Sequence, residues 1–236
     1  MKNKKGFTLT EVLLAVMIVG LISISLAALT RSAARESGVG RSKVMMRNNL
    51  SRFMRTLRAD LQEATRVDEC ALCAADGDNG VFEVGAGDTV KLLRLTKNQM
   101  RDGNPVLEQI TTQVGSTSST EKKTVLYCFE NGTETSNVVP EGAIRGGKIY
   151  RYEYPTAIVL TCDEAKNSGE VSKEVALSHV KYIPSIAGYA VPMIGRRSFS
   201  REGINSMLRV NIITELDSVP VVNETVEETF VAPIGY

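Results

Sequence analysis

The chain is poor in the residues and motifs from which enzymes build active sites. It has one histidine, His179, in a segment predicted to be a β-strand, where a position on a sheet face is expected. The sequence contains no G-x-S-x-G motif, no phosphate-binding loop, and no pair of carboxylates with a metal-binding neighbour at helical spacing. We therefore predict a protein that is not an enzyme and that uses no cofactor and no metal.

Charged residues are absent from positions 12–30, directly after Glu11. In a helix, at about 1.5 Å per residue, this run is about 28 Å long, close to the thickness of the hydrocarbon layer of a bilayer. Three lysines lie in the first five residues, and Glu11 would enter the lipid on this helix. A charge there costs on the order of 3 kcal/mol unless another group compensates it, so the carboxylate needs an explanation.

The sequence G-F-T-L-T-E-V-L-L-A at residues 6–15 resembles the class III signal of type IV prepilins and pseudopilins. The resemblance implies that a membrane-embedded prepilin peptidase cleaves after Gly6 and that Phe7 is then N-methylated. Glu11 lies four residues after Phe7, as the glutamate of that family does. Thr10 stands where the family more often has an aliphatic residue, and we expect no effect of this difference on processing.

A freed amine at Phe7 would be a cation at the membrane depth of the Glu11 carboxylate. Pairing of these groups between neighbouring subunits would remove two uncompensated charges from a medium that solvates them poorly. It would also set the axial register of subunit addition, and the Phe7 ring would add apolar area at that end. The resemblance implies as partners the prepilin peptidase/methyltransferase, other major and minor pilins or pseudopilins, and an assembly ATPase with its inner-membrane platform.

Two other interpretations of this N-terminus are weaker. A secretory signal peptide also has a basic start and an apolar core, but its cleavage site follows the core, and residues 27–29 match the required small-residue pattern poorly. A plain single-pass anchor would leave Glu11 incidental. The positive-inside rule does not decide the orientation, because Arg31 and Arg35 flank the far end almost as densely as lysines flank the near end.

We predict four segments. They are a leader at residues 1–6, a transmembrane and filament-core helix at 7–30, an amphipathic helical stem at 31–67, and a β-rich extracytoplasmic head at 68–236. The protein would cross the inner membrane once, with the head outside the cytoplasm, and would then pass into a pilus or pseudopilus.

Charge is distributed unevenly between stem and head. Residues 31–66 hold nine basic and three acidic side chains, whereas residues 67–236 hold 16 basic and 23 acidic ones. The stem of one subunit could therefore attract the head of another. A solvated basic helix beside an ordinary acidic surface is an equally good explanation.

Residues 41–67 contain neither proline nor glycine and are predicted to be helical. Apolar side chains recur there at spacings of three and four, which predicts a stripe that lies on the sheet of the head. The stripe consists of Met46, Leu50, Phe53, Leu57, Leu61 and Ala64. The other faces carry Arg47, Arg52, Arg55 and Arg58, with Asp60 and Glu63 near the end.

Gly38 and Gly40 predict a break or bend of the helix just beyond the membrane segment, since glycine has low helix propensity. The arginine-rich stem also invites a nucleic-acid interpretation. We regard DNA contact as the weaker explanation, because no recognisable nucleic-acid-binding fold and no interleaved aromatic residues accompany it.

The sequence pattern beyond residue 67 is typical of β-strands joined by turns. Strands are predicted at residues 81–84, 89–95, 124–130, 148–154, 157–162, 175–183, 207–214 and 228–232. Turns are predicted at 74–80, 85–88, 131–132 and 146–147, with a flexible polar loop at 111–124. A long helix followed by short strands in meander order predicts an α+β, pilin-like fold, in which the helix packs on an antiparallel β-sheet head.

A second resemblance concerns the head. Its strand order, with a tyrosine-rich strand at 149–152 after an earlier strand around Tyr127, a later segment at 175–183 and a terminal strand at 208–213, is similar to that of the larger minor subunits. These are the J-type pseudopilin of type II secretion and the W-type minor pilin of type IV pili. The size of the head agrees with this placement.

All four cysteines fall in the predicted extracytoplasmic head, where disulfides persist. We expect the pairs Cys70–Cys73, which is local in sequence, and Cys128–Cys162, which would join two strands. The second pair closes a loop of about 35 residues and contributes on the order of 3–4 kcal/mol in the chain-entropy model. A four-thiolate zinc site is the weaker alternative, because only one half has the C-x-x-C spacing.

Residues 76–79 have the acidic density of a calcium loop but lack the glutamate that completes an EF-hand, so a polar turn is the default.

These observations predict a non-catalytic minor pilin or pseudopilin at or near the tip of a type IV pilus or a type II secretion pseudopilus. The alternative is a pilus-borne adhesin or DNA-uptake binding module. Tyr150, Tyr152 and Tyr154 are candidate contacts for it, since alternation puts them on one sheet face; that face is equally suited to a core.

Overall fold

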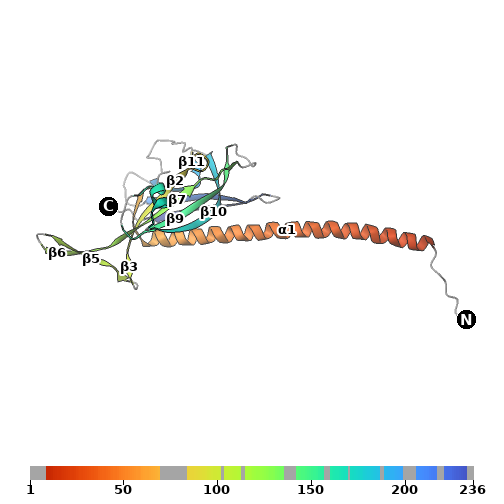
Figure 1. Cartoon of the computed structure of the whole chain (residues 1–236), viewed down its shortest axis with the longest axis horizontal. Coiled ribbons are helices and arrows are strands. Elements are labelled where there is room, and N and C mark those ends of the chain that lie inside the picture. The colour runs from red at the N-terminus through yellow and green to blue at the C-terminus, as the bar shows by residue number, and fades with distance from the viewer. Residues whose placement is uncertain are drawn as a thin grey trace.

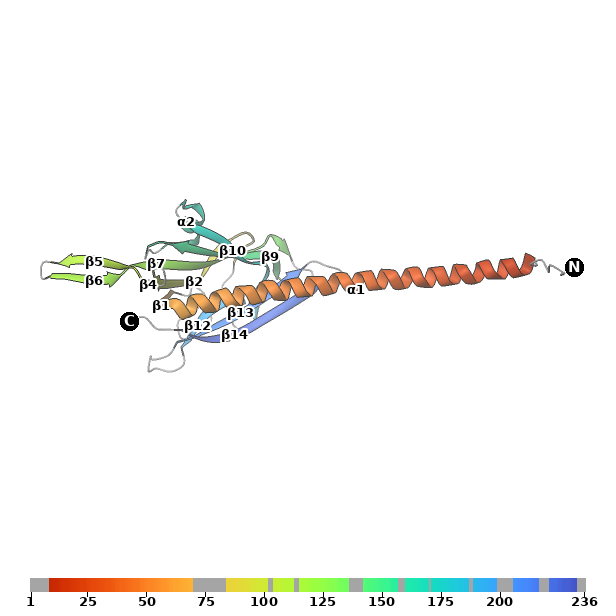
Figure 2. The same ribbon diagram turned by 90° about the horizontal axis from the view of Figure 1, so that it is seen from below.

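One long helix, α1 (Leu9–Glu63), carries a β-sheet head on its C-terminal half, and the head extends beyond the end of the helix (Figure 1). The computed structural model describes residues 9–69, 84–101, 104–112, 115–135, 142–156, 160–169, 171–186, 189–198, 206–216 and 221–232. With 55 residues, α1 is about 80 Å long at 1.5 Å per residue. Its N-terminal half projects from the head without contact to it (Figure 2).

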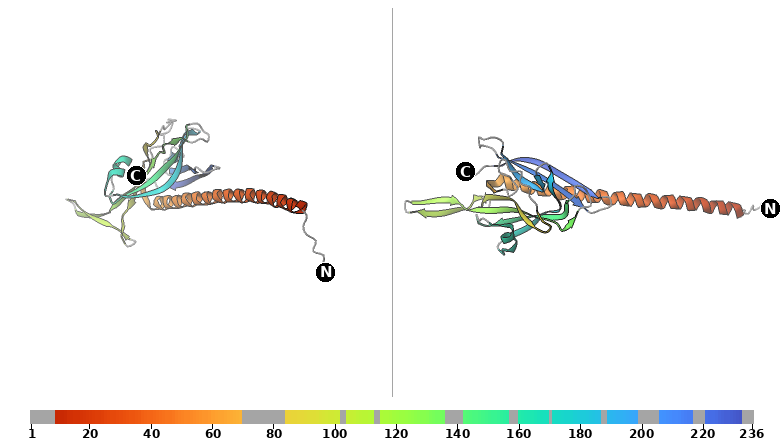
Figure 3. Two further views of the ribbon diagram at one scale, coloured as in Figure 1. Left: turned by 45° about the vertical axis from the view of Figure 1, so that its right-hand side comes forward. Right: turned by 90° about the horizontal axis from the view of Figure 1, so that it is seen from above.

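The helix is continuous, so the predicted break at Gly38 and Gly40 is wrong. It curves gently along its length (Figure 3). Both glycines face open space, and each costs only about 1 kcal/mol relative to alanine in a helix that contains no proline. The predicted end at Val67 is also wrong, because strand β1 (Ala64–Glu69) begins directly after Glu63.

The predicted apolar stripe of the stem is confirmed. All six of its residues are buried against the head: Met46, Leu50, Phe53, Leu57, Leu61 and Ala64. Met54 joins them. The Phe53 ring meets the Tyr127 ring of the sheet edge to face, with the ring centroids 6.2 Å apart.

The described residues of the head form the remaining strands and the short helix α2. In chain order these are β2 (Thr89–Asn98), β3 (Met100–Arg101), β4 (Asn104–Pro105), β5 (Leu107–Thr112), β6 (Gly115–Thr120), β7 (Lys122–Glu130), β8 (Glu134–Thr135), β9 (Ile144–Tyr154), α2 (Cys162–Asn167), β10 (Ser172–Ile186), β11 (Tyr189–Val191), β12 (Met193–Ser198), β13 (Ser206–Leu216) and β14 (Val222–Ala232). The long helix packed on an antiparallel sheet confirms the predicted α+β, pilin-like arrangement.

The main sheet has the order β1-β2-β7-β9-β10-β13-β12, with β14 on the other side of β13. Strands β10 and β13 share only two register pairs, Val180 with Thr214 and Lys181 with Ile213. The sheet thus consists of two wings, one from β1 to β10 and one formed by β12, β13 and β14. Helix α1 lies across both, in contact with β2 and β10 of the first wing and β14 of the second (Figure 2).

A buried ion pair lies where the two wings meet. Lys181 Nζ of β10 is 2.6 Å from a carboxylate oxygen of Glu215 on β13, and both side chains are almost fully buried. Each of the two charges offsets part of the cost of burying the other.

Six predicted strands are confirmed by β2, β7, β9, β10, β13 and β14, each of which is longer than predicted. The predicted turn at 85–88 is also present. His179 lies in β10, as predicted, with a positive φ of 59° at an irregularity of the register with β9. Residues 74–80 and the first three residues of the predicted strand at 81–84 lie outside the described residues.

Three predictions for the head are wrong. The described residues of the predicted loop at 111–124 lie mostly in strands: the end of β5, all of β6 and the start of β7. Strands β5 and β6 pair in a hairpin that projects from the head at the end away from the apolar half of α1 (Figures 1 and 2). The strand predicted at 157–162 is replaced at its end by α2, which begins at Cys162. The turn predicted at 146–147 lies inside β9.

The two glycines inside β9 have separate physical reasons. Gly146 has a φ of +84°, which side-chain-bearing residues rarely adopt. At Gly147 a Cβ atom would lie 2.6 Å from the ring of Phe129, so the ring packs where a side chain would otherwise be. A glycine pair of this kind marks close packing within a strand rather than a turn.

Candidate functional site

The predicted processing site lies at the start of α1. Gly6 and Phe7 fall outside the described residues, whereas Glu11 lies in the first turn of the helix and is exposed. Among the residues that the structure describes, one helix is long and apolar enough to cross a membrane, and the apolar part lies near the N-terminus.

The apolar face of this helix is uncovered. None of the described residues 9–45 is buried, and most large apolar side chains up to Leu29 are about half exposed or more. Water is a poor environment for a surface of this size, so lipid or other apolar helices are the surroundings that it fits.

A second site, which the sequence did not predict, joins the last turn of α1 to the sheet. The Asp60 carboxylate is buried and accepts four hydrogen bonds. Lys97 Nζ donates at 2.8 Å, the Tyr127 hydroxyl at 2.5 Å, and Arg151 donates twice, from Nε at 2.7 Å and from Nη2 at 3.1 Å. These three donors come from β2, β7 and β9, so a single carboxylate holds three strands to the helix.

The surrounding charges complete the network. Glu63 lies 2.5 Å from Lys97 Nζ, and Glu153 contacts both Arg151 at 2.8 Å and Lys123 at 2.7 Å. The network thus contains three carboxylates and three cations. Lys97 and Lys123 lie directly opposite each other on β2 and β7, and their repulsion is offset by these carboxylates.

Hydrogen bonds within the network determine the charge states of Asp60 and Lys97. Burial raises the pKa of the Asp60 carboxyl, but hydrogen bonds from Arg151, Lys97 and Tyr127 outweigh burial and hold the pKa below its usual value of 3.8. Burial lowers the pKa of Lys97, but hydrogen bonds to Asp60 and Glu63 hold it above its usual value of 10.5. Asp60 and Lys97 are therefore both charged at neutral pH.

The position of Asp60 on the helix indicates from sequence alone that its carboxylate is buried, which the sequence analysis did not predict. Asp60 follows Leu57 by three residues and precedes Leu61, so it lies on the apolar face rather than on the solvated one. Carboxylates in the last turn of a helix also interact unfavourably with the helix dipole, and α1 has no basic residue in that turn. The sheet supplies the compensating cations instead.

Arginines of the stem reach the head on both wings. Arg47 Nε is 3.1 Å from Glu224 of β14, and Arg58 also pairs with β14, through Glu228. Arg52 Nη2 is 3.3 Å from Glu174 of β10. The charge complementarity between stem and head is therefore partly used within one chain. Such exposed pairs contribute little energy each.

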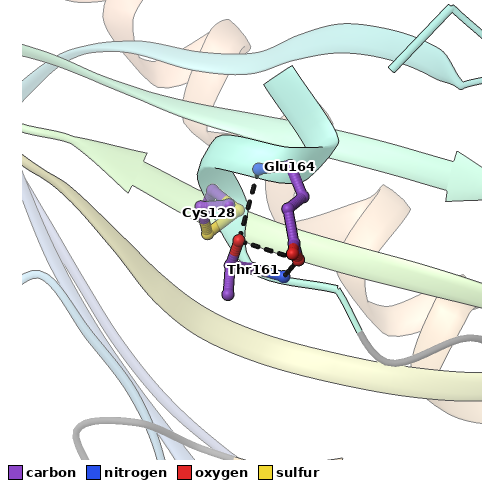
Figure 4. Close-up of a disulfide and its surroundings, with 4 residues drawn as sticks. Cys128, Thr161 and Glu164 are labelled. Atoms are coloured by element: carbon purple, nitrogen blue, oxygen red, sulfur yellow. Dashed lines mark hydrogen bonds between the residues drawn. A yellow bond between two sulfur atoms is a disulfide. The ribbon is translucent and has the colours of Figure 1, made fainter. Parts of the chain in front are cut away.

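A disulfide holds α2 on the face of the sheet opposite α1 (Figure 4). The structure joins Cys128 of β7 to Cys162 with Cα atoms 5.9 Å apart, which is consistent with the pairing expected from the sequence. Thr161 caps α2: its hydroxyl accepts from the Glu164 amide at 3.2 Å, and the Glu164 carboxylate accepts from the Thr161 amide at 2.8 Å. Cys70 and Cys73 lie outside the described residues.

The three tyrosines that a binding module would need are buried beneath α2. Tyr150, Tyr152 and Tyr154 form a small core with Leu126, Cys128, Cys162 and Ala165. Burial, followed by the neighbouring Tyr150, raises the pKa of Tyr152 to about 12. Lys173 Nζ lies 4.4 Å from the centroid of the Tyr150 ring. The tyrosine face is therefore a second core, and the exposed-aromatic surface of an adhesin is not formed by these residues.

Within the described residues, no group of three or more His, Cys, Asp or Glu side chains is placed to hold a metal ion. Cys128 and Cys162 are bonded to each other and so are not free to ligate zinc. The acidic loop at 76–79 lies outside the described residues.

Comparison with known protein families gives a match at the N-terminus. Residues 1–27 match the family described as prokaryotic N-terminal methylation motif. No curated protein and no solved structure matches the chain. The chain therefore carries a type IV pilin-like class III signal, which implies processing by a prepilin peptidase and assembly with pilins. Together with the apolar N-terminal helix, this signal fits a structural subunit anchored by a single membrane span.

Proposed function

We propose that the protein is a minor pilin or pseudopilin, a non-catalytic subunit cleaved after Gly6, N-methylated on Phe7, and assembled at or near the tip of a type IV pilus or type II secretion pseudopilus. The observation that supports this most is a continuous helix that begins in a methylation motif, leaves its apolar N-terminal half bare, and ends in a charge network that fixes it to a β-sheet head.

The proposed chemistry at the N-terminus is pairing of charges in an apolar medium. Cleavage turns Phe7 into the first residue and leaves a cationic amine four positions before Glu11. The amine of one subunit and the Glu11 carboxylate of a neighbour stabilise each other far more in lipid or a helix bundle than in water, because the low dielectric strengthens their attraction. A mismatch of one helical turn would separate them, so the pair selects one axial register.

The bare half of α1 serves as the membrane anchor first and the filament core later. Transfer from lipid to a bundle of similar helices keeps its apolar side chains out of water, so extraction does not require their hydration. The Asp60 network keeps the head at a fixed position on the helix during this transfer, because separation would leave buried charges without partners.

The minor and near-tip assignment is supported by the size of the head and by the strand order that is similar to the J-type and W-type subunits. The central sheet, its added wing and the projecting hairpin give the head surface for lateral contacts with other subunits.

Filament incorporation tests the proposal. In cells that assemble the filament, a Glu11→Ala variant should enter the membrane normally and be recovered with sheared filaments at a small fraction of the wild-type amount. Ser23→Ala, a change on the same apolar helix that alters no charge, is the matched control and should incorporate as the wild type does. Equal incorporation of the Glu11→Ala variant would contradict the proposed role.

A further inference from the structure

A bare, basic length of helix separates the apolar part of α1 from the head. Residues 31–45, which we call the neck, begin at the end of the uncharged run, and the first buried residue of the helix is Met46. The neck contains one acidic residue, Glu36, and four exposed basic residues, which are Arg31, Arg35, Arg41 and Lys43. The next basic residue along the helix, Arg47, is bound to Glu224 of the head.

The continuity of the helix fixes where these charges lie when the apolar run is in a bilayer. The polar headgroup layer extends about 5–8 Å beyond the hydrocarbon on each side. Arg31 directly follows the uncharged run, and Arg35 lies about 7 Å beyond its end at 1.5 Å per residue. Both therefore fall within the headgroup layer.

The direction of the side chains brings the other two charges closer to the membrane. In an α-helix every Cα–Cβ bond tilts toward the N-terminus, and long side chains follow it. The apolar run lies N-terminal to the neck, so Arg41 and Lys43 lean back toward the membrane surface from backbone positions about 16 and 20 Å beyond the run. Their charges then lie within about one Debye length of the headgroup phosphates.

We infer that the neck binds anionic phospholipid headgroups on the surface from which the head projects. This inference rests on the membrane insertion contained in the proposed function, and not on processing or on filament assembly. Phosphate is the matching ligand, because arginine forms paired hydrogen bonds with its oxygens and a cluster of cations next to a membrane span favours acidic lipids.

The neck is covalently continuous with the apolar run, which favours lipid over another protein as the partner that binds it. The neck cannot leave the membrane surface while the apolar run is inserted, so headgroups surround Arg31 and Arg35 at all times before assembly. Cleavage of the proposed leader would also remove Lys2, Lys4 and Lys5, which leaves the neck as the one basic cluster beside the membrane helix. It would then hold the helix at a defined depth until the subunit is extracted.

Lipid selectivity of the purified full chain tests this inference. The chain is reconstituted in phosphatidylcholine vesicles that contain a trace of spin-labelled phosphatidylglycerol or spin-labelled phosphatidylcholine. The motionally restricted fraction of each probe gives the ratio of their association constants. The wild type should prefer phosphatidylglycerol by about fivefold or more, the effect of at least one basic residue held at the surface. The preference should fall toward one in 1 M NaCl.

Two variants with the same loss of charge separate the neck from the net charge of the protein. R31Q/R35Q/R41Q/K43Q should remove most of the preference for phosphatidylglycerol. What remains would come from Lys2, Lys4 and Lys5 where the leader is still attached. R55Q/R101Q/K122Q/K148Q, which removes four exposed cations outside the neck, should retain it. Glutamine is a good helix former, so both variants keep α1 intact, which circular dichroism verifies.

Equal association of the two lipids with the wild type would overturn the inference. An unchanged preference in the neck variant, or an equal loss in the control variant, would overturn it as well. If the neck variant lost filament incorporation while the wild type showed no lipid preference, the neck would be a protein-contacting surface instead. The assay is independent of leader cleavage and of filaments, so failure of the proposed function leaves its result interpretable.

Discussion

Lys97 of β2 and Asp60 in the last turn of α1 form a buried ion pair, with 2.8 Å between Nζ and Oδ1. Thirty-seven residues separate them in the sequence, yet the junction between stem and head is organised around them. Arg151 and Tyr127 bind the same carboxylate, so removing Asp60 takes away the buried acceptor that all three donors share. Lys97 would keep only Glu63, and Arg151 would keep only Glu153.

Asp60→Ala should lower the free energy of unfolding of the head by about 3–5 kcal/mol, because it removes the buried carboxylate that Lys97 and Arg151 share. The measurement is denaturant unfolding of the full chain in detergent, followed by tyrosine fluorescence, since the sequence contains no tryptophan. Arg52→Ala breaks an exposed ion pair on the same helix and should cost less than about 1 kcal/mol. Similar losses of unfolding free energy in the two variants would show that the buried network stabilises the head no more than an exposed ion pair does.

The stability of the head should also depend on pH in a defined direction. Asp60 has a folded pKa below its usual value of 3.8, so the unfolded chain binds more protons in acid. Its contribution is fully present above about pH 4 and is lost as the pH falls through the lower, folded value. Lys97 has a raised pKa, so its contribution is present below pH 10.5 and is lost as the pH rises above that value.

Asp60→Asn should therefore flatten the acid limb of a plot of unfolding free energy against pH. Glu153, whose pKa is also held below its usual value, leaves a residual slope in that limb. An acid limb that is as steep in Asp60→Asn as in the wild type would assign the acid sensitivity to other groups.

The sequence predicted the stem better than the junction. The stripe from Met46 to Ala64 is visible because its period is local, whereas the partners of Asp60 lie on three strands that only the folded sheet brings together. The prediction of a bend at Gly38 and Gly40 gave too much weight to residue propensity in a long, otherwise favourable helix. A capping box from Thr161 to Glu164 marked the start of α2 but was overlooked in a segment predicted as a strand.

The hairpin of β5 and β6 shows that residue composition alone can fail to predict a strand. Its second strand is G-S-T-S-S-T, a composition typical of flexible loops, and the two strands nevertheless pair at six consecutive positions without a bulge. Backbone hydrogen bonds at its base, from Gln99 to Glu121 at 2.7 Å and from Glu121 to Val106 at 2.8 Å, position it. Composition alone does not reveal such an anchor.

Removing the Cys128–Cys162 disulfide should cost about 3–4 kcal/mol, since the bond joins residues 34 positions apart and so closes a loop in the unfolded chain. The double variant Cys128→Ser/Cys162→Ser is compared with the wild type by thermal unfolding under non-reducing conditions. Thr161→Ala removes only the cap of α2 and should cost about 1 kcal/mol. A double variant no less stable than Thr161→Ala would contradict a structural role of the bond.

Gly147→Ala should destabilise the head by about 1–3 kcal/mol, because the new Cβ atom would lie 2.6 Å from the ring of Phe129. Gly169→Ala places a methyl group where no heavy atom lies within 4 Å and serves as the matched control. Chemical unfolding of both variants is the measurement. Equal stability of the two would mean that the Phe129 ring moves aside without cost.

The N-terminal processing event is the central claim, and intact mass spectrometry tests it most directly. The chain is extracted from the membrane of cells with an active prepilin peptidase and compared with a Gly6→Leu variant from the same cells. We predict that the wild type lacks its first six residues and carries one added methyl group on Phe7, while the variant keeps its leader. A wild-type chain that retains residues 1–6 in these cells would contradict the account.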